Sequence, residues 1–209
     1  MNKYATEFIG TFFLVLTIGC TVVAGGQGVI PPLAIGAALM VMVFAGGHVS
    51  GAHYNPAVTL GVFLRGRCPA GDVAPYMIAQ TAGAAAAAAA VIFLKAGATF
   101  PAASVPQVMP AFVAELLYTF ALVYVVLNVA TAKANAGNSF YGLAIGMTVM
   151  AGAFAVGPIS GAVFNPAVAI GAAVMGLIPW ATLWIYLAAN FLGGAAAAAV
   201  FKALNPVDR

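Results

Sequence analysis

Charged residues are scarce in this sequence. Lysine and arginine number 7 and aspartate and glutamate 4, so that 5% of the 209 residues are charged and 64% are hydrophobic. A soluble globular domain carries roughly 25% charged residues, and this chain could not cover its surface with charge. Lipid is therefore its expected solvent. The net charge of +3 comes from dispersed residues, which argues against a nucleic-acid partner.

Cysteine is also scarce. Cys20 lies in an apolar stretch and Cys68 beside two arginines, and we interpret them as two separate thiols rather than a disulfide. Neither His48 nor His53 is paired with cysteine or carboxylate at a metal-ligand spacing. We therefore expect no metal site and no cofactor. No Ser–His arrangement suggests an intramembrane enzyme.

Long apolar segments dominate what remains. A bilayer core of about 30 Å needs about 20 apolar residues in a helix, and we expect six segments to cross it. They are residues 4–24, 33–47, 73–95, 111–131, 140–156 and 179–202. The first segment is not interpreted as a signal peptide, because a counterpart of it recurs later in the chain.

One short motif occurs twice. Residues 50–58 and 160–168 both read Ser-Gly-Ala, a variable residue, an aromatic residue and Asn-Pro-Ala-Val. Asn is a favoured helix N-cap and Pro is tolerated at the first helical position. The apolar runs that follow, 57–63 and 167–175, are too short to span a bilayer. Each copy therefore predicts a loop that turns into a half-length helix.

The duplication extends beyond this motif. Leu-Ala-Ile-Gly at 33–36 recurs 110 positions later at 143–146, and Glu7 with its neighbours matches Glu115 at an offset of 108. We predict a single domain, 1–209, built from repeats 1–100 and 110–209. Three crossings per repeat turn the second repeat upside down, and such inverted repeats with broken helices place a site at the membrane midplane.

The two asparagines are predicted to meet at that midplane. Non-helical backbone at this depth is tolerated where it lines a cavity, so residues 47–54 and 157–164 are expected to line a path. Their carbonyls would offer acceptors, the Asn55 and Asn165 amides would donate, and both half-helix dipoles would repel cations. The alternative is that both asparagines only cap helices.

Basic residues indicate the orientation. With a cytoplasmic N-terminus, all of them except Lys95 face the cytoplasm: Lys3, Arg65, Arg67, Lys133, Lys202 and Arg209. This bias follows the positive-inside rule. We expect a multi-pass protein of the plasma (inner) membrane with both termini cytoplasmic.

Residues 47–61 resemble the first signature loop of the aquaporins and glycerol facilitators, the major intrinsic proteins, and the resemblance covers nearly the whole chain. It implies a homotetrameric channel for water or small uncharged solutes. It also implies that Glu7 and Glu115 support the two loops, although an ion-coupling carboxylate of a transporter is the rival interpretation. For His53, a place on the path and a structural hydrogen bond are equally open. The expected pore-lining residues are Asn55, Asn165, Pro56, Pro166, His53, Ala57 and Ala167.

One departure from the family pattern stands out. The position three residues after the second Asn is usually Arg and is here Val168. By family spacing, the other filter positions fall on Ile35, Ala153 and Ala162. Such a filter would be wide, uncharged and poor in donors, which puts water selectivity and proton exclusion in doubt and could favour dewetting. Alternatively, Tyr54 or Phe164 forms the narrowest point.

We therefore expect an all-α membrane protein that acts as a passive channel for water, small uncharged solutes or both. One alternative is a facilitator of larger or less polar neutral solutes, such as glycerol, urea, ammonia or gas, with low water flux. Another is a secondary transporter, since these also use inverted repeats.

Overall fold

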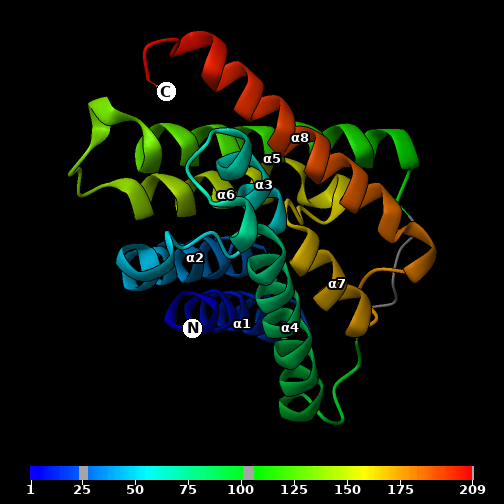
Figure 1. Cartoon of the computed structure of the whole chain (residues 1–209). Coiled ribbons are helices and arrows are strands. Elements are labelled where there is room, and N and C mark those ends of the chain that lie inside the picture. Colours follow the sequence, from blue (N-terminus) through cyan, green and yellow to red (C-terminus); the bar gives the residue numbers. More distant parts are fainter. Residues whose placement is uncertain (24–27, 101–105, 209) are drawn as a thin grey trace.

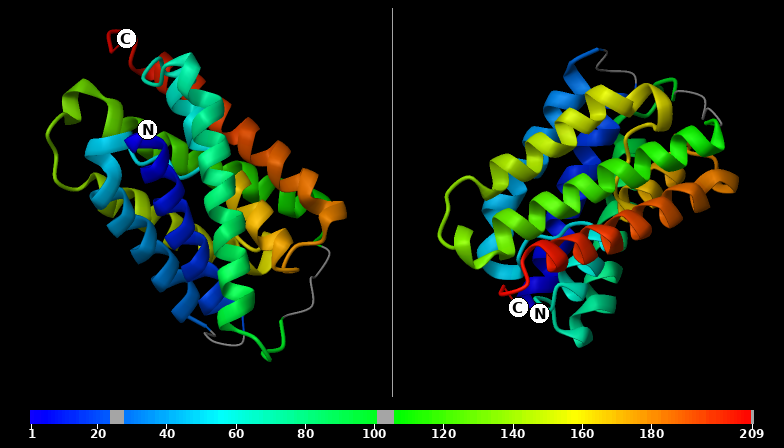
Figure 2. Two further views of the ribbon diagram at one scale, coloured as in Figure 1. Left: turned by 60° about the horizontal axis from the view of Figure 1, so that its bottom comes forward. Right: turned by 90° about the horizontal axis from the view of Figure 1, so that it is seen from above.

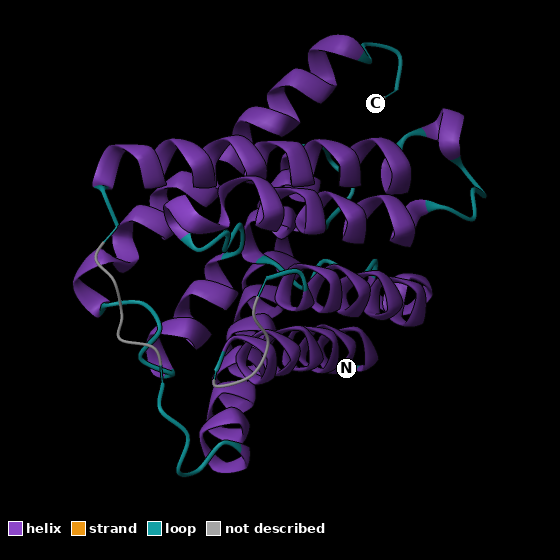
Figure 3. Ribbon diagram, turned by 180° about the vertical axis from the view of Figure 1, so that it is seen from behind, coloured by secondary structure: helices purple, strands orange, loops and turns teal. Residues whose placement is uncertain are grey.

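The structure is a computed structural model that describes residues 1–23, 28–100 and 106–208. Over these ranges the chain forms helices, turns and loops and no strand (Figure 3). Six helices are long and apolar enough to cross a membrane, which confirms the predicted fold class. They are α1 (Asn2–Val22), α2 (Ile30–Ser50), α4 (Ala70–Leu94), α5 (Val108–Val126, extended by the π-helical turn η1, Leu127–Thr131), α6 (Tyr141–Ser160) and α8 (Leu183–Leu204).

Two short helices lie in the middle of this bundle (Figure 1). They are α3 (Pro56–Leu64) and α7 (Pro166–Val174), with nine residues each. At 1.5 Å per residue each is only about 14 Å long and cannot cross a bilayer. Both start at a capping asparagine followed by proline. Two short 3₁₀ helices, η2 (Lys133–Asn135) and η3 (Trp180–Thr182), complete the described elements.

The packing repeats itself in the two halves. Helix α1 packs on α4 as α5 packs on α8, and each half-helix packs on the last long helix of the other half, α3 on α8 and α7 on α4. Glycines permit the close crossings. A Cβ on Gly83 would lie 2.4 Å from the Phe8 carbonyl oxygen, and one on Gly193 would lie 2.6 Å from that of Leu116. Larger residues would push these helices apart.

The predicted loops are too long at their N-terminal ends. Helices α2 and α6 continue to Ser50 and Ser160, so the non-helical stretches are 51–55 and 161–165 rather than beginning at 47 and 157. The reason lies in the glycines that follow. Gly51 and Gly161 have φ values of 83° and 89°, the left-handed conformation that ends a helix and that glycine adopts without steric penalty.

Both chain ends lie at the same end of the bundle (Figure 2). We call the end where α1 begins and α8 ends the terminus side, and the opposite end the distal side. Ion pairs gather on the terminus side: Lys3 Nζ lies 2.6 Å from Asp72 Oδ2, and Arg65 Nη2 lies 2.8 Å from Asp208 Oδ1. Asp208 thereby ties the C-terminal segment to the end of α3.

Candidate functional site

The first loop is held by a buried carboxylate. Glu7 on α1 is fully buried, and its Oε1 accepts hydrogen bonds from Ser50 Oγ (2.6 Å) and the His53 amide (2.9 Å). Its Oε2 accepts from the Tyr54 amide (2.6 Å) and from Gln80 Nε2 on α4 (2.8 Å). Every partner is a donor, so the carboxylate satisfies the amides of His53 and Tyr54, which lie outside any helix.

The second loop repeats this arrangement. Glu115 on α5 is fully buried, and it accepts from Ser160 Oγ (2.7 Å) and the amides of Val163 (2.9 Å) and Phe164 (2.7 Å). No basic side chain pairs with either glutamate among the described residues. These contacts match a supporting role better than an ion-coupling one.

Four non-glycine residues of the loops adopt left-handed backbone conformations. They are Ala52, Tyr54, Ala162 and Phe164, with φ between 50° and 54°. Such residues cost about 1–3 kcal/mol each and persist where the surroundings over-determine them. Here the amides of Tyr54 and Phe164 point to the glutamates, while their carbonyls point to the opposite loop. Sequence reasoning missed this feature.

The two asparagines join the loops across the midplane. Asn55 Oδ1 accepts from the Ala57 amide (2.8 Å), which caps α3, and its Nδ2 donates to the Phe164 carbonyl (2.8 Å). Asn165 does the same with the Ala167 amide (2.9 Å) and the Tyr54 carbonyl (2.9 Å). An amide nitrogen carries two hydrogens, so each Asn keeps one N–H for the space beside it.

That space is a cavity of about 940 Å³. It is bordered on the distal side by Pro31, Pro32, Gln107 and Ile178, among others, and it passes both capping asparagines. Toward the terminus side its lining includes Val58, Val126 and Ile145. The cavity therefore runs along the axis on which the two half-helices meet.

The expected site residues fall into two groups. Those on the cavity wall are Asn55, Asn165 and His53 together with Ile35, Ala153, Ala162 and Val168. Pro56, Pro166, Ala57 and Ala167 are buried in the first turns of the half-helices and are not part of the wall. The Ala57 carbonyl packs against Gly194 of α8, which explains why this turn faces protein.

His53 lies between the cavity and the first half-helix. It borders the cavity, and its Nδ1 lies 3.1 Å from Thr59 Oγ1. The aromatic side chains that precede the asparagines, Tyr54 and Phe164, also contact other residues of the bundle. The Tyr54 hydroxyl donates to the Met42 carbonyl (3.0 Å), and the Phe164 ring stacks on Tyr118 at 5.4 Å.

Further supporting residues emerge from the structure. The Tyr76 hydroxyl donates to the Ser50 carbonyl (2.8 Å), and the Tyr186 hydroxyl donates to the Ser160 carbonyl (2.9 Å). These bonds satisfy the last carbonyls of α2 and α6, which a helix end otherwise leaves unpaired. The signal that could have found them is their spacing of 110, the offset of the repeat.

Six helices of membrane-spanning length surround two half-helices that meet beside an axial cavity, an architecture that membrane channels and transporters share. Over residues 1–201 the sequence matches the model of the Major intrinsic protein family. It is 41% identical to aquaporin NIP1-3 of Oryza sativa subsp. japonica, over 100% of this chain and 75% of that protein. It is 36% identical to aquaporin Z of Rhodopseudomonas palustris, over 98% and 94% of the two chains.

Among solved structures, the fold is similar to the X-ray structure of the aquaglyceroporin from Plasmodium falciparum. The TM-score is 0.86 over 99% of this chain and 97% of that one, at 22% identity, which supports the fold alone. The chain belongs to the major intrinsic protein family. It is a multi-pass membrane protein and a passive channel for water and small solutes, not an enzyme.

Proposed function

We propose that this channel passes neutral solutes of the size of glycerol or urea as well as water, through an uncharged filter. We call this filter the distal ring, and it consists of Ile35, Ala153, Ala162 and Val168. The observation that carries the proposal is the composition of this ring, whose four side chains hold neither a charge nor a hydrogen-bond donor. A ring without donors cannot replace the hydration of water, and its two alanines leave more room for larger molecules than bulkier side chains would.

The midplane supplies the polar contacts that the distal ring lacks. Asn55 and Asn165 each have one remaining amide N–H beside the cavity. The N-termini of α3 and α7 add a partial positive charge of about half a unit each. A hydroxyl or carbonyl oxygen is favoured at this point, whereas a cation is repelled, so neutral solutes are the expected cargo.

The glutamates are proposed to act as loop supports, because each accepts several loop donors.

We further propose one channel domain, 1–209, built from repeats 1–100 and 110–209. The terminus side is proposed to face the cytoplasm, since Lys3, Arg65, Arg67, Lys133 and Lys202 belong to it and Lys95 to the distal side. A plasma-membrane homotetramer is proposed from the family; light scattering of the detergent-solubilised protein tests the tetramer.

Stopped-flow flux into proteoliposomes tests the cargo. The purified protein is reconstituted, and shrinkage and re-swelling are followed with gradients of glycerol, urea and sucrose. We expect glycerol and urea to enter faster than into protein-free liposomes, in proportion to their gradients and regardless of a sodium or proton gradient. Water flux without any entry of glycerol or urea would contradict the proposal. Concentrative uptake driven by an ion would contradict passive transport itself.

A further inference from the structure

The inverted repeat gives the distal ring a counterpart in the other half of the bundle. An offset of 110 positions relates each of its residues to one residue of the opposite repeat. The pairs are Ile35 with Ile145, Val168 with Val58, Ala162 with Ala52 and Ala153 with Val43. Because the repeats are inverted, the second set belongs on the terminus side of the asparagines. The two sets differ in one residue, valine at 43 in place of alanine at 153.

The two sets differ clearly in burial. On the distal side Ile35, Ala153 and Ala162 are half-buried, as expected for side chains that border an open space, whereas Val168 is only 5% exposed. On the terminus side the exposed fractions are 5% for Ile145 and 2% for Val43. Val58 and Ala52 are also buried, at 2% and 6%. Three members of the distal ring are therefore more exposed than their terminus-side counterparts, while Val168 and Val58 are both buried.

The cavity ends where this packing begins. Its lining reaches Val58, Val126 and Ile145. It includes no residue of 59–64, the rest of α3, and none of 127–144, the segment from η1 to the beginning of α6. Val43 lies outside the lining but belongs to the same buried apolar cluster as Val58 and Ile145.

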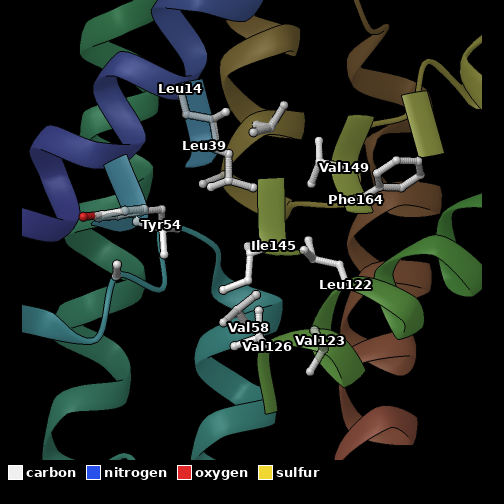
Figure 4. Close-up of a cluster of buried hydrophobic side chains, with 14 of the residues drawn as sticks. Leu14, Leu39, Tyr54, Val58, Leu122, Val123, Val126, Ile145, Val149 and Phe164 are labelled. Atoms are coloured by element: carbon white, nitrogen blue, oxygen red, sulfur yellow. The ribbon is translucent and has the colours of Figure 1, made fainter. Parts of the chain in front are cut away.

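Apolar neighbours surround this point. Figure 4 shows Val58, Val126 and Ile145 gathered between α3, α5 and α6, with Leu122 beside them. A ring of this composition offers a passing molecule no hydrogen bond, and apolar constrictions hinder water by dewetting. Neither Asn55 nor Asn165 can supply a hydrogen bond at this ring, because their side-chain amides lie at the midplane.

We propose that passage through this pore is limited at a second constriction, the terminus-side ring of Val43, Ala52, Val58 and Ile145. The distal ring admits the solute, and the terminus-side ring sets the size limit and the rate. Val43 is the residue that makes the second ring the narrower one. This inference rests on the proposed function, since it concerns where a neutral solute is held back.

The repeat also provides the control for the test. Val43→Ala gives the terminus-side ring the composition of the distal ring, and Ile145→Ala widens it further. Ile35→Ala is the matched control, because it makes the same change at the equivalent distal position. Glycerol and urea permeabilities of the wild type and the three variants are measured in proteoliposomes, with assembly checked by size-exclusion chromatography.

We expect Val43→Ala and Ile145→Ala to raise both permeabilities severalfold and Ile35→Ala to leave them close to wild type. The inference would be overturned if Ile35→Ala raised the permeabilities as much as the terminus-side variants or more, or if the terminus-side variants raised neither permeability. In both cases the measured flux of glycerol and urea would still support the proposed function. Absence of flux from all assembled proteins would overturn the proposed function and this inference with it. If Ile145→Ala does not assemble, the same comparison is made with Val43→Ala and with the milder variants Ile145→Val and Ile35→Val.

Discussion

The first loop, residues 51–55, has more support than the second, residues 161–165. Glu7 accepts four hydrogen bonds in the first repeat, and Glu115 accepts three in the second. The additional donor is Gln80, which also donates to Thr59 Oγ1 at 2.9 Å. Thr59 in turn contacts His53. The equivalent residues of the second repeat are Asn190, Ala169 and Val163.

One methylene accounts for much of this difference. Asn190 is shorter than Gln80, and instead of contacting Glu115 it accepts a hydrogen bond from Thr119 Oγ1 at 3.0 Å. Its Nδ2 has no hydrogen-bond partner among the residues that the structure describes. The loop beside it is also more open, since Ala162 and Val163 are partly exposed whereas Ala52 and His53 are buried. Two loops with the same backbone conformation can thus differ in exposure: the first is buried and well supported, and the second is partly exposed beside the cavity.

The largest effect is expected from removing the glutamate charge. Glu7→Gln keeps the shape but turns one acceptor into a donor that faces other donors. Each buried group left unpaired costs about 1–3 kcal/mol, so the variant should unfold at a much lower temperature than the wild type. Glu115→Gln should lose less, because it serves one donor fewer. Thermal unfolding in detergent measures both; equal loss in the two variants would show that Gln80 adds no support.

A smaller loss of stability is expected from Asn165→Asp. Aspartate still caps α7, but it cannot donate to the Tyr54 carbonyl, and losing that bond costs about 1–3 kcal/mol. It also places a negative charge where the half-helix dipoles repel cations. We expect cation leak in electrical recordings. Asn55→Asp, which makes the same change at the equivalent asparagine of the first repeat, is the matched control. Cation conductance and neutral flux equal to wild type would show that Asn165 does not border the path.

The smallest effect is expected from Asp208→Asn, which removes the acceptor of Arg65 at the end of the first half-helix. Asp208 bonds the Lys133 amide and Arg65, whereas the residue equivalent to Arg65 is Met175. The Lys133 amide, and then Arg65, hold the pKa of Asp208 below its ordinary value of 3.8.

A lowered pKa in the folded state stabilises the fold above the ordinary pKa, and this contribution is lost as the pH falls through the lowered value. Asp208→Asn should therefore slightly lower the melting temperature at neutral pH. The difference from wild type should shrink below a pH of about 3.8. A difference that stays constant with pH would mean that the charge of Asp208 is not involved.

Much of the fold could be predicted from signals carried by neighbouring residues in the sequence. The Asn-Pro pairs predicted both half-helices because capping depends on neighbouring residues, and the apolar runs predicted six crossings. The left-handed Tyr54 has no such signal, since its amide is held by Glu7, 47 positions away in the sequence. The bonds of Asn55 and Asn165 to the opposite loops were equally inaccessible, because they join residues more than 100 positions apart.

The central claim is that an uncharged distal ring lets this pore accept solutes larger than water. Val168→Arg tests it most directly, because it adds bulk, a fixed charge and several donors at one position of the ring. The arginine needs acceptors, which the loop carbonyls near Ala162 can supply, since an unpaired buried charge would cost about 3–5 kcal/mol and prevent folding. Assembly in detergent is therefore checked first.

The decisive measurement is the ratio of glycerol to water permeability for wild type and assembled Val168→Arg in the same liposomes. We predict that the ratio falls, because the arginine narrows the ring and bonds water, and that any proton leak shrinks with it. An unchanged ratio in a well-assembled variant would contradict the account, since it would show that Val168 and the distal ring do not border the path of the solute.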